Sequence, residues 1–390
     1  MLFWFLSTTS RAEVDSLQVC LPCNEIQKDS SLTLLATKWK SGDLKILHLG
    51  DSHVQIGHFS GEIKRLLQAK NSGIHFPYPL AKSVDGRLFK TKASGNWTGV
   101  SVLKPASGIN ISLTGYAVST RDTSANIQWI AKDSLLSFRR VRVWTESDSC
   151  ALTPELGPFF QVTQVQQQGN MRYYDFESTY LVNEFTLSLR KVGGGDQFTL
   201  HGIELPVEEK GIEYNDLGVA GAQFTHLKSR STLVLDQIKI LKPDLIICSF
   251  GTNEAYNANW ESQSYKKAWQ VFIQEIQAIS PKSVFLLTSP PDTRSQNRIP
   301  KHQQEVIRVL AETNVPFYDL NAAMGGFGSS KDWVKKGYFL KDQLHLTKDG
   351  YHIQAKLFAL ALFKSWGDQA SYENLQKQVN QHMISVGIPK

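Results

Sequence analysis

Short apolar runs alternate with amphipathic stretches in two separated parts of this chain. Residues 45–49, 245–250 and 284–287 are such runs, and each is followed by apolar side chains at helical spacing. Strands that are apolar on both faces are typical of a parallel sheet covered by helices on both sides. The chain is therefore expected to form an α/β fold, and ligands in such folds bind at the carboxyl ends of the strands.

Residues 84–208 have a different pattern. Apolar and polar residues alternate there in four segments, as expected for strands with one buried face. These segments are 111–116, 141–144, 185–189 and 197–205. Their number and length suit a β-sandwich, so we predict that residues 84–208 form an inserted β-rich domain. The α/β domain then consists of residues 41–83 and 209–390, and it follows an N-terminal segment of residues 1–40.

The composition is that of a soluble globular protein with a large core, since 41% of the 390 residues are hydrophobic and 20% are charged. The formal net charge is +6, but no run of Lys and Arg resembles a nucleic-acid-binding arm. We therefore expect no nucleic acid as a partner. No stretch approaches the roughly 20 apolar residues of a membrane span. The sequence does not indicate an oligomeric state.

The N-terminal segment bears on where the protein works. Residues 1–6 are apolar and Arg11 follows, like the end of a secretory signal whose basic part is missing. This predicts a periplasmic or secreted protein, and the equally weighted alternative is a short unstructured N-terminus. Cys20 and Cys23 are weak evidence for a zinc site, because no second CxxC pair follows. A local disulfide or two free thiols suit their spacing as well.

Four side chains have the chemistry of a serine esterase. Ser52 follows the run 45–49 at the turn into a predicted helix, and Asn253 follows the run 245–250. Asp342 and His345 come late in the chain, with two residues between them. A serine hydroxyl can attack an acyl carbon, a histidine can take its proton, an aspartate can orient the histidine, and an asparagine amide can hold an oxyanion. No metal-ligand cluster stands out, and this chemistry needs none.

Four blocks of the sequence carry a family resemblance. They are Gly-Asp-Ser-His at 50–53, Asn-Asp-Leu-Gly-Val-Ala-Gly-Ala at 215–222, Gly-Thr-Asn-Glu at 251–254 and Asp-Gln-Leu-His-Leu-Thr at 342–347. With these blocks the chain resembles SGNH (GDSL-like) hydrolases over residues of about 45–80 and 211–365. The resemblance implies a flavodoxin-like three-layer α/β/α fold that uses no cofactor.

The same resemblance implies a role for each matched residue. Ser52 would be the nucleophile, His345 the base and Asp342 the group that orients it. Gly221 and Asn253, together with the backbone N–H of Ser52, would form the oxyanion hole. A glycine suits this place because it has no Cβ to obstruct the approaching acyl oxygen. Many members have Asp at the position of Glu254, but the family role falls on Asn253.

A narrower resemblance points to a substrate. The Gly-Asp-Ser-His turn, the β-rich insert after the first helix and the run 198–205 are similar to bacterial peptidoglycan O-acetylesterases. In those enzymes the insert is similar to a carbohydrate-binding jelly roll. The implied partner is an acetylated glycan of the cell wall, and the implied reaction removes O-acetyl groups from muramic acid. The alternatives are an esterase or lipase on another acylated carbohydrate or lipid, an O-acetyltransferase, and a non-catalytic glycan-binding protein.

Three further residues are candidates for contact with the substrate. His53 could line the acyl pocket beside Ser52 or cap the following helix. Trp333 and Tyr338 follow a Gly-rich loop and precede Asp342, so we expect them at the rim of the cleft. The aromatic residues of the insert are expected mostly in its core.

Overall fold

A six-stranded sheet forms the centre of the α/β part of the molecule, in the strand order β15-β3-β16-β17-β18-β2. The computed structural model describes residues 17–385 except 71, 85, 87, 147–151, 193–196, 208–209 and 381–382. The six strands are β15 (Glu213–Gly218), β3 (Lys45–Gly50), β16 (Leu245–Ser249), β17 (Val284–Thr288), β18 (Phe317–Tyr318) and β2 (Ile26–Gln27). The first five are parallel and β2 is antiparallel. Numbered along the chain, the parallel strands have the flavodoxin-like order 2-1-3-4-5.

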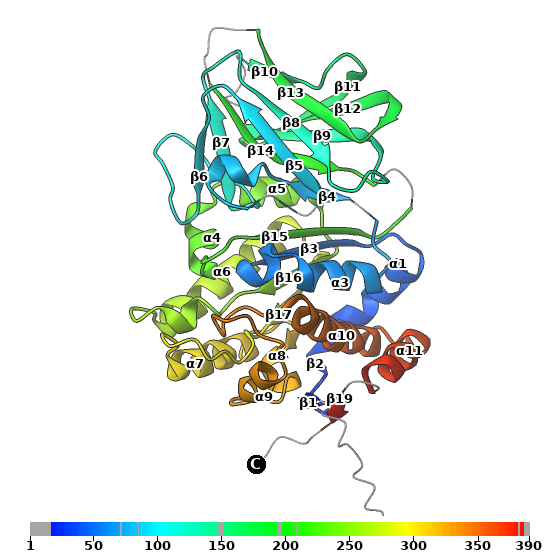
Figure 1. Ribbon diagram of the computed structural model, residues 1–390, viewed down its shortest axis with the longest axis vertical. Coiled ribbons are helices and arrows are strands. Elements are labelled where there is room, and N and C mark those ends of the chain that lie inside the picture. Colours follow the sequence, from blue (N-terminus) through cyan, green and yellow to red (C-terminus); the bar gives the residue numbers. More distant parts are fainter. Residues whose placement is uncertain are drawn as a thin grey trace, which may run out of the picture.

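Helices cover both faces of this sheet, which confirms the predicted α/β class (Figure 1). On one face, the helices α3 (His58–Leu66) and α10 (Lys348–Ser365) bury side chains with Ile46, Tyr214 and Ile247 of the strands. On the other face, the helices α5 (Val234–Leu241), α6 (Ser262–Ile279) and α7 (Pro300–Ala311) bury side chains with Leu47 and Ile246. Neighbouring strand residues point to opposite faces, so the continuously apolar runs supply both clusters.

The helices have the following bounds. The α-helices are α1 (Ala36–Lys40), α2 (Ser52–Gln55), α3 (His58–Leu66), α4 (Phe224–Arg230), α5 (Val234–Leu241), α6 (Ser262–Ile279), α7 (Pro300–Ala311), α8 (Leu320–Ala323), α9 (Ser330–Lys335), α10 (Lys348–Ser365) and α11 (Gln369–Asn380). The 3-10 helices are η1 (Asp29–Leu35), η2 (Tyr78–Ala81) and η3 (Glu254–Tyr256). Among the described residues, no helix is long and apolar enough to cross a membrane.

Two antiparallel sheets lie beyond the edge strand β15 (Figure 1). One has the order β10-β13-β8-β5, and the other has the order β11-β12-β9-β14-β7-β6. Their strands are β5 (Phe89–Ser94), β6 (Thr98–Ser101), β7 (Tyr116–Thr120), β8 (Asn126–Ala131), β9 (Phe138–Glu146), β10 (Leu152–Glu155), β11 (Phe160–Gln168), β12 (Met171–Val182), β13 (Glu184–Lys191) and β14 (Phe198–Leu205). The β-rich character predicted for this segment is confirmed, and its limits at 84 and 208 stay predictions. The short strand β4 (Gly73–His75), which precedes the predicted boundary, already pairs with β14.

The two antiparallel sheets share one hydrophobic cluster. Trp129 on β8 and Phe185 on β13 belong to it, as do Val141 on β9 and Phe198 on β14. Trp129 is fully buried, in line with the expectation that aromatic residues of the insert form core.

The insert also shares buried surface with the α/β part. Trp144 and Tyr173 pack in the cluster that contains α5, α6 and the parallel strands. In the other direction, Val219 and Ala222, which follow β15, pack in the cluster of the insert. The two parts therefore bury each other's side chains and are not joined by linkers alone.

A chain of hydrogen bonds crosses four strands of the parallel sheet. The Nδ1 of His48 lies 2.8 Å from the hydroxyl of Tyr214, and its Nε2 lies 2.8 Å from Oγ of Ser249. Thr288 continues the chain by donating to Ser249 over 2.9 Å. Burial lowers the pKa of His48 to about 3, so the ring is neutral at pH 7 and can donate from one nitrogen while it accepts at the other.

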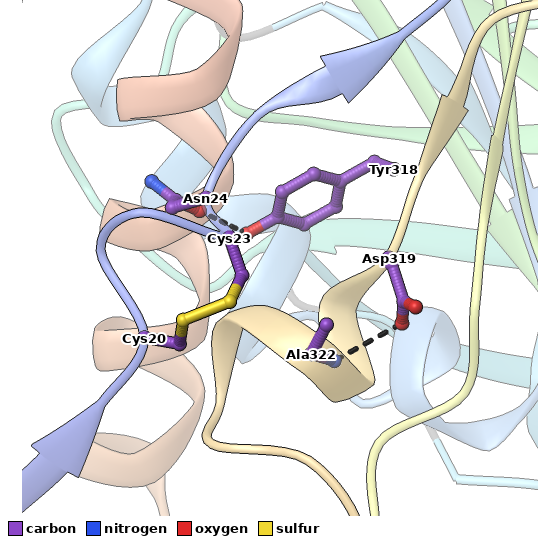
Figure 2. The surroundings of a disulfide bond; sticks show 6 residues. All are labelled: Cys20, Cys23, Asn24, Tyr318, Asp319 and Ala322. Carbon is purple, nitrogen blue, oxygen red and sulfur yellow. Dashed lines mark hydrogen bonds between the residues drawn. A yellow bond between two sulfur atoms is a disulfide. The ribbon is translucent and has the colours of Figure 1, made fainter. Parts of the chain in front are cut away.

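The N-terminal segment is attached to the body of the fold beside a disulfide between Cys20 and Cys23 (Figure 2). The N–H of Cys20 donates to the carbonyl of Ala323 over 3.0 Å. Asn24 accepts from the Tyr318 hydroxyl over 2.7 Å and donates to the Leu357 carbonyl over 2.9 Å. The sequence left a zinc site, a disulfide and two free thiols open for Cys20 and Cys23, and the structure contains the disulfide. β1 (Leu17–Val19) pairs with β19 (Met383–Ser385), and the apolar residues 1–6 lie outside the described residues.

A buried carboxyl group joins helix α4 to the loop after β16. The Oε1 of Glu254 accepts the N–H of Phe224 over 2.8 Å, and this N–H has no partner within its own helix. Glu254 is fully buried. Burial raises the pKa of Glu254 to about 8, although the hydrogen bond from Phe224 lowers it in part. The group is therefore largely protonated at neutral pH.

We predict that Glu254→Gln becomes more stable relative to the wild type as the pH rises from 5 to 8. The carboxyl ionises near 4.5 when unfolded and near 8 when folded, so the wild type takes up a proton on folding within this window. The free energy of unfolding of the wild type therefore falls as the pH rises. The variant has no ionisable group at this position, so its free energy of unfolding lacks this decrease. Thermal denaturation at pH 5 and pH 8 measures the difference, with the exposed Glu373→Gln as a control. A gap between Glu254→Gln and the wild type that stays constant with pH would contradict the prediction.

Candidate active site

Ser52 stands where strand β3 turns into the short helix α2. A Cβ at Gly50 would lie 2.3 Å from Cγ2 of Val54 and 2.8 Å from the carbonyl oxygen of Ser249. Glycine is therefore the residue that this close packing admits. Asp51 caps α2, because its Oδ1 accepts the N–H of His53 over 3.0 Å. The turn thus has the predicted strand-turn-helix form and presents Ser52 at the carboxyl edge of the sheet.

A continuous hydrogen-bonded chain joins Ser52 to residues far along the sequence. Oγ of Ser52 lies 2.8 Å from Nε2 of His345, and Nδ1 of His345 lies 2.7 Å from Oδ2 of Asp342. The other carboxylate oxygen of Asp342 accepts the N–H groups of Leu344 and His345, each over 3.0 Å. The structure thus brings together the three residues that the sequence analysis assigned to a triad.

The electrostatics of this chain suit proton transfer. Partial burial would raise the pKa of Asp342, but the hydrogen bonds from the ring and backbone of His345 and from Leu344 outweigh it and lower the pKa. Asp342 is therefore ionised at neutral pH and holds a proton on Nδ1 of His345. The lone pair of Nε2 then faces the hydroxyl of Ser52, as a general base requires.

The two other predicted oxyanion-hole residues lie on neighbouring loops. Nδ2 of Asn253 donates to the carbonyl of Ala222 over 2.9 Å and points toward Oδ2 of Asp51 at 3.4 Å. Gly221 precedes Ala222, is exposed, and has a φ of +79° that favours glycine. The bond to Ala222 therefore fixes the Asn253 amide directly beside Gly221.

Gln55 is a residue of this site that the sequence analysis missed. Its Oε1 accepts the N–H of Ala220 over 2.6 Å, one residue before Gly221. Its Nε2 donates to Oγ of Ser83 over 2.9 Å and to the hydroxyl of Tyr116 over 3.2 Å. One side chain thus joins the helix of Ser52, the loop of Gly221 and strand β7 of the insert. Its position three residues after Ser52, on the same side of one helical turn, was the available signal.

Asp51 is a second residue that was missed. Burial raises its pKa to about 7, although the hydrogen bond from the His53 N–H and the charge of His345 lower it in part. The Asp51 carboxyl therefore loses its proton as the pH rises through the neutral range. The resulting negative charge attracts the Asn253 amide more strongly.

The three candidates for substrate contact have different outcomes. His53 is buried, its Nδ1 lies 2.9 Å from the hydroxyl of Tyr351, and its ring centroid is 5.4 Å from that of His345. Its side chain does not cap the helix, since Asp51 does. The rim position predicted for Trp333 is wrong, because Trp333 is fully buried in the core that includes α10 and donates to the Met324 carbonyl over 3.1 Å.

Tyr338 packs its ring against Trp333 and is partly exposed, and its place at the cleft stays a prediction. Within the described part of the chain, no three His, Cys, Asp or Glu side chains lie together as metal ligands would.

Comparisons with known proteins agree with this geometry. A search of curated protein sequences finds no relative. Residues 203–353 match the model of the GDSL-like Lipase/Acylhydrolase family. This range holds three of the four sequence blocks, and the strands of the insert separate it from the block of Ser52.

Solved structures extend the likeness to nearly the whole chain. A structure described as "Peptidoglycan O-acetylesterase in action, 5 min" matches with a TM-score of 0.66 and 22% sequence identity, over 90% of this chain and 96% of that one. A lipase/acylhydrolase from Enterococcus faecalis matches 41% of this chain and 78% of its own, at 19% identity and a TM-score of 0.29. A family two carbohydrate esterase from Cellvibrio japonicus matches 72% of this chain and 98% of its own, at 11% identity and a TM-score of 0.29. The chain is a carboxylic ester hydrolase, and the part of it that matches the GDSL-like Lipase/Acylhydrolase family is residues 203–353.

Proposed function

We propose that this hydrolase removes O-acetyl groups from a glycan, and that its substrate is the O-acetylated muramic acid of peptidoglycan. The observation that carries the proposal is the hydrogen-bonded chain from Ser52 through His345 to Asp342 at the carboxyl edge of the sheet. The similarity of the whole fold to a structure described as a peptidoglycan O-acetylesterase supports the choice of glycan.

The reaction begins with attack by Ser52 on the acetyl carbonyl carbon. As the new C–O bond forms, Nε2 of His345 takes the proton of the hydroxyl, and ionised Asp342 stabilises the resulting imidazolium. The tetrahedral intermediate then collapses, the bond to the sugar oxygen breaks, and His345 returns the proton to that oxygen. His345 next takes a proton from a water molecule that attacks the acetyl-serine. The bond between the acyl carbon and Oγ of Ser52 then breaks, His345 returns the proton to Oγ, and the acetyl group leaves as acetic acid, which ionises to acetate.

The negative oxygen of the intermediate is stabilised by the N–H groups of Ser52 and Gly221 and by Nδ2 of Asn253. One hydrogen of the Asn253 amide is held by the carbonyl of Ala222, which fixes the plane of the amide. The other has only the long 3.4 Å contact with Asp51, so it is available to the oxyanion. Gln55 holds the N–H of Ala220 and so positions the N–H of Gly221 that follows it.

We further propose that residues 84–208 form a jelly-roll-like module that helps to bind the glycan, inserted into a catalytic domain of residues 41–83 and 209–390. Its closeness to the catalytic loops supports this role. A Cβ at Gly221 would lie 3.4 Å from Cδ1 of Leu103. Arg230 donates to the carbonyl of Val102 over 2.7 Å. A polymer bound at Ser52 would therefore meet residues of the insert.

A periplasmic or secreted location is part of the proposal. The disulfide between Cys20 and Cys23 supports it, because disulfides persist in oxidising compartments and are rare in the cytosol.

Mass spectrometry of O-acetylated muropeptides before and after incubation with the protein tests the function. We expect each acetylated muropeptide to lose the mass of one acetyl group, with release of an equal amount of acetate. Hydrolysis of p-nitrophenyl acetate without any loss from muropeptides would contradict peptidoglycan as the substrate and leave the esterase chemistry intact.

We predict that Ser52→Ala lowers kcat for p-nitrophenyl acetate by about four orders of magnitude or more, because no acetyl-enzyme can form. The circular dichroism spectrum should stay that of the wild type. Ser264→Ala, at an exposed position in α6, is the matched control and should keep wild-type activity. Activity of Ser52→Ala within a few-fold of the wild type would mean that the nucleophile is another residue.

We predict that Asn253→Ala lowers kcat by about a hundredfold with little change in KM, since it removes one donor that acts in the transition state. Steady-state kinetics at a fixed pH measures both constants, and the melting temperature checks the fold. A rise in KM at constant kcat would reassign Asn253 to substrate binding.

We predict that Gln55→Ala lowers kcat by about tenfold at unchanged KM, as expected when one hydrogen bond no longer positions the loop of Gly221. Tyr116→Phe removes only one of the two acceptors of Nε2 and should have a smaller effect. Equal losses in the two variants would indicate that Gln55 acts through its contact with the insert and not through Ala220.

A further inference from the structure

A basic cavity lies beside the catalytic loops and is not used in the mechanism above. Its volume is about 340 Å³, and it is formed by the loop after β17 and by the Gly-rich loop that leads into α9. Its lining includes three basic and three polar side chains. These are Arg294, Arg298, Lys331, Ser295, Gln296 and Ser330.

Hydrogen bonds attach the wall of this cavity to both catalytic loops. The N–H of Arg294 donates to the carbonyl of Gln343 over 2.9 Å, and Gln343 is next to Asp342. On the other side, the N–H of Ile299 donates to the carbonyl of Ala255 over 2.8 Å, two residues after Asn253. The cavity therefore borders the loops that carry the base and the oxyanion donor.

The cavity has a net positive charge, because Asp292, the acidic residue of its lining, is already paired with Arg298. Asp292 is fully buried, forms an ion pair with Arg298 and accepts from Oγ of Ser330 over 2.5 Å. Arg294 and Lys331 are both exposed. Neither forms an ion pair with any residue in the described part of the chain. Two uncompensated cations in a concave site attract an anion.

We propose that this cavity binds a carboxylate carried by the acetylated sugar. The proposal rests on the proposed function and narrows its substrate class to acidic glycans. Muramic acid bears a lactyl carboxyl group, which is either free or linked to a peptide that has carboxylates of its own. The planar fork of Arg294 matches a carboxylate, and Lys331 adds a point charge. A neutral acetylated glycan has no group for this cavity.

The test is the double variant Arg294→Gln/Lys331→Gln. The matched control is Lys267→Gln/Lys282→Gln, which removes the same charge from α6 and from the turn before β17. Three acetylated substrates are compared: muropeptides with peptide, the same glycan after an amidase has removed the peptide, and neutral oligosaccharides of N-acetylglucosamine. The readout is the ratio of kcat/KM on each acidic substrate to that on the neutral one.

We expect the double variant to lower this ratio by about tenfold or more, through KM, while the control keeps the wild-type ratio. Added salt should lower the ratio in the wild type more than in the double variant. A loss confined to the peptide-bearing substrate assigns the carboxylate to the peptide, and a loss confined to the amidase-treated glycan assigns it to the lactyl group, which is free only there. A loss on both acidic substrates shows that the cavity accepts either carboxylate. A ratio that does not change, or that falls equally in the control, overturns the proposal.

Calorimetric binding of two probes, N-acetylmuramyl dipeptide with its peptide carboxylate and N-acetylmuramic acid with its free lactyl carboxylate, separates this inference from the proposed function. Neither probe carries an acetyl ester, so its affinity does not depend on hydrolysis. Tighter binding to the wild type than to the double variant supports the cavity even for a protein that fails to deacetylate peptidoglycan. Equal affinities of the two proteins for both probes contradict the cavity and leave the deacetylation of peptidoglycan untouched.

Discussion

The parallel pairing of β3 with β16 determines where the chemistry takes place. Gly50 is opposite Ser249 in this register, so the two strands end at the same level and their loops leave the sheet side by side. These loops carry Ser52 and Asn253. The strand order changes direction at this point, since β15 lies on the other side of β3, and ligands bind at such switch points. The other residues of the candidate site, Gly221, Asp342 and His345, lie on loops that meet these two strand ends.

The insert is packed against the α/β part and lies close to the loop of Gly221. It shares hydrophobic clusters with the helices of the α/β part and supports the loop of Gly221 through Tyr116 and Gln55. A mutation in its core near Val219 would therefore disturb the loop of Gly221 as well as the stability of the insert. Such coupling is expected where two parts bury a common apolar surface.

The sequence predicts those features that depend on local pattern. The parallel sheet followed from apolar runs, and Ser52, Asn253 and His345 could be assigned because each follows a strand or a turn with a recognisable block. What it could not predict depends on tertiary packing. Trp333 follows a Gly-rich loop, and its sequence neighbours do not reveal that the loop folds back and buries the indole against α10. The chain of His48, Tyr214 and Ser249 was hidden for the same reason, since it crosses strands that are far apart in the sequence.

The separation of Ser52 from His345 has a consequence for how the enzyme matures. The two residues are 293 positions apart, so the proposed nucleophile is made early and its proposed base late. At a translation rate of 5–20 residues per second, about 15–60 s pass between them. Throughout this time the nascent chain holds a serine with no partner to activate it. Under the proposed mechanism, ribosome-bound chains that end before His345 are therefore inactive, and the same topology that assembles the site postpones its activity until the final helices are available.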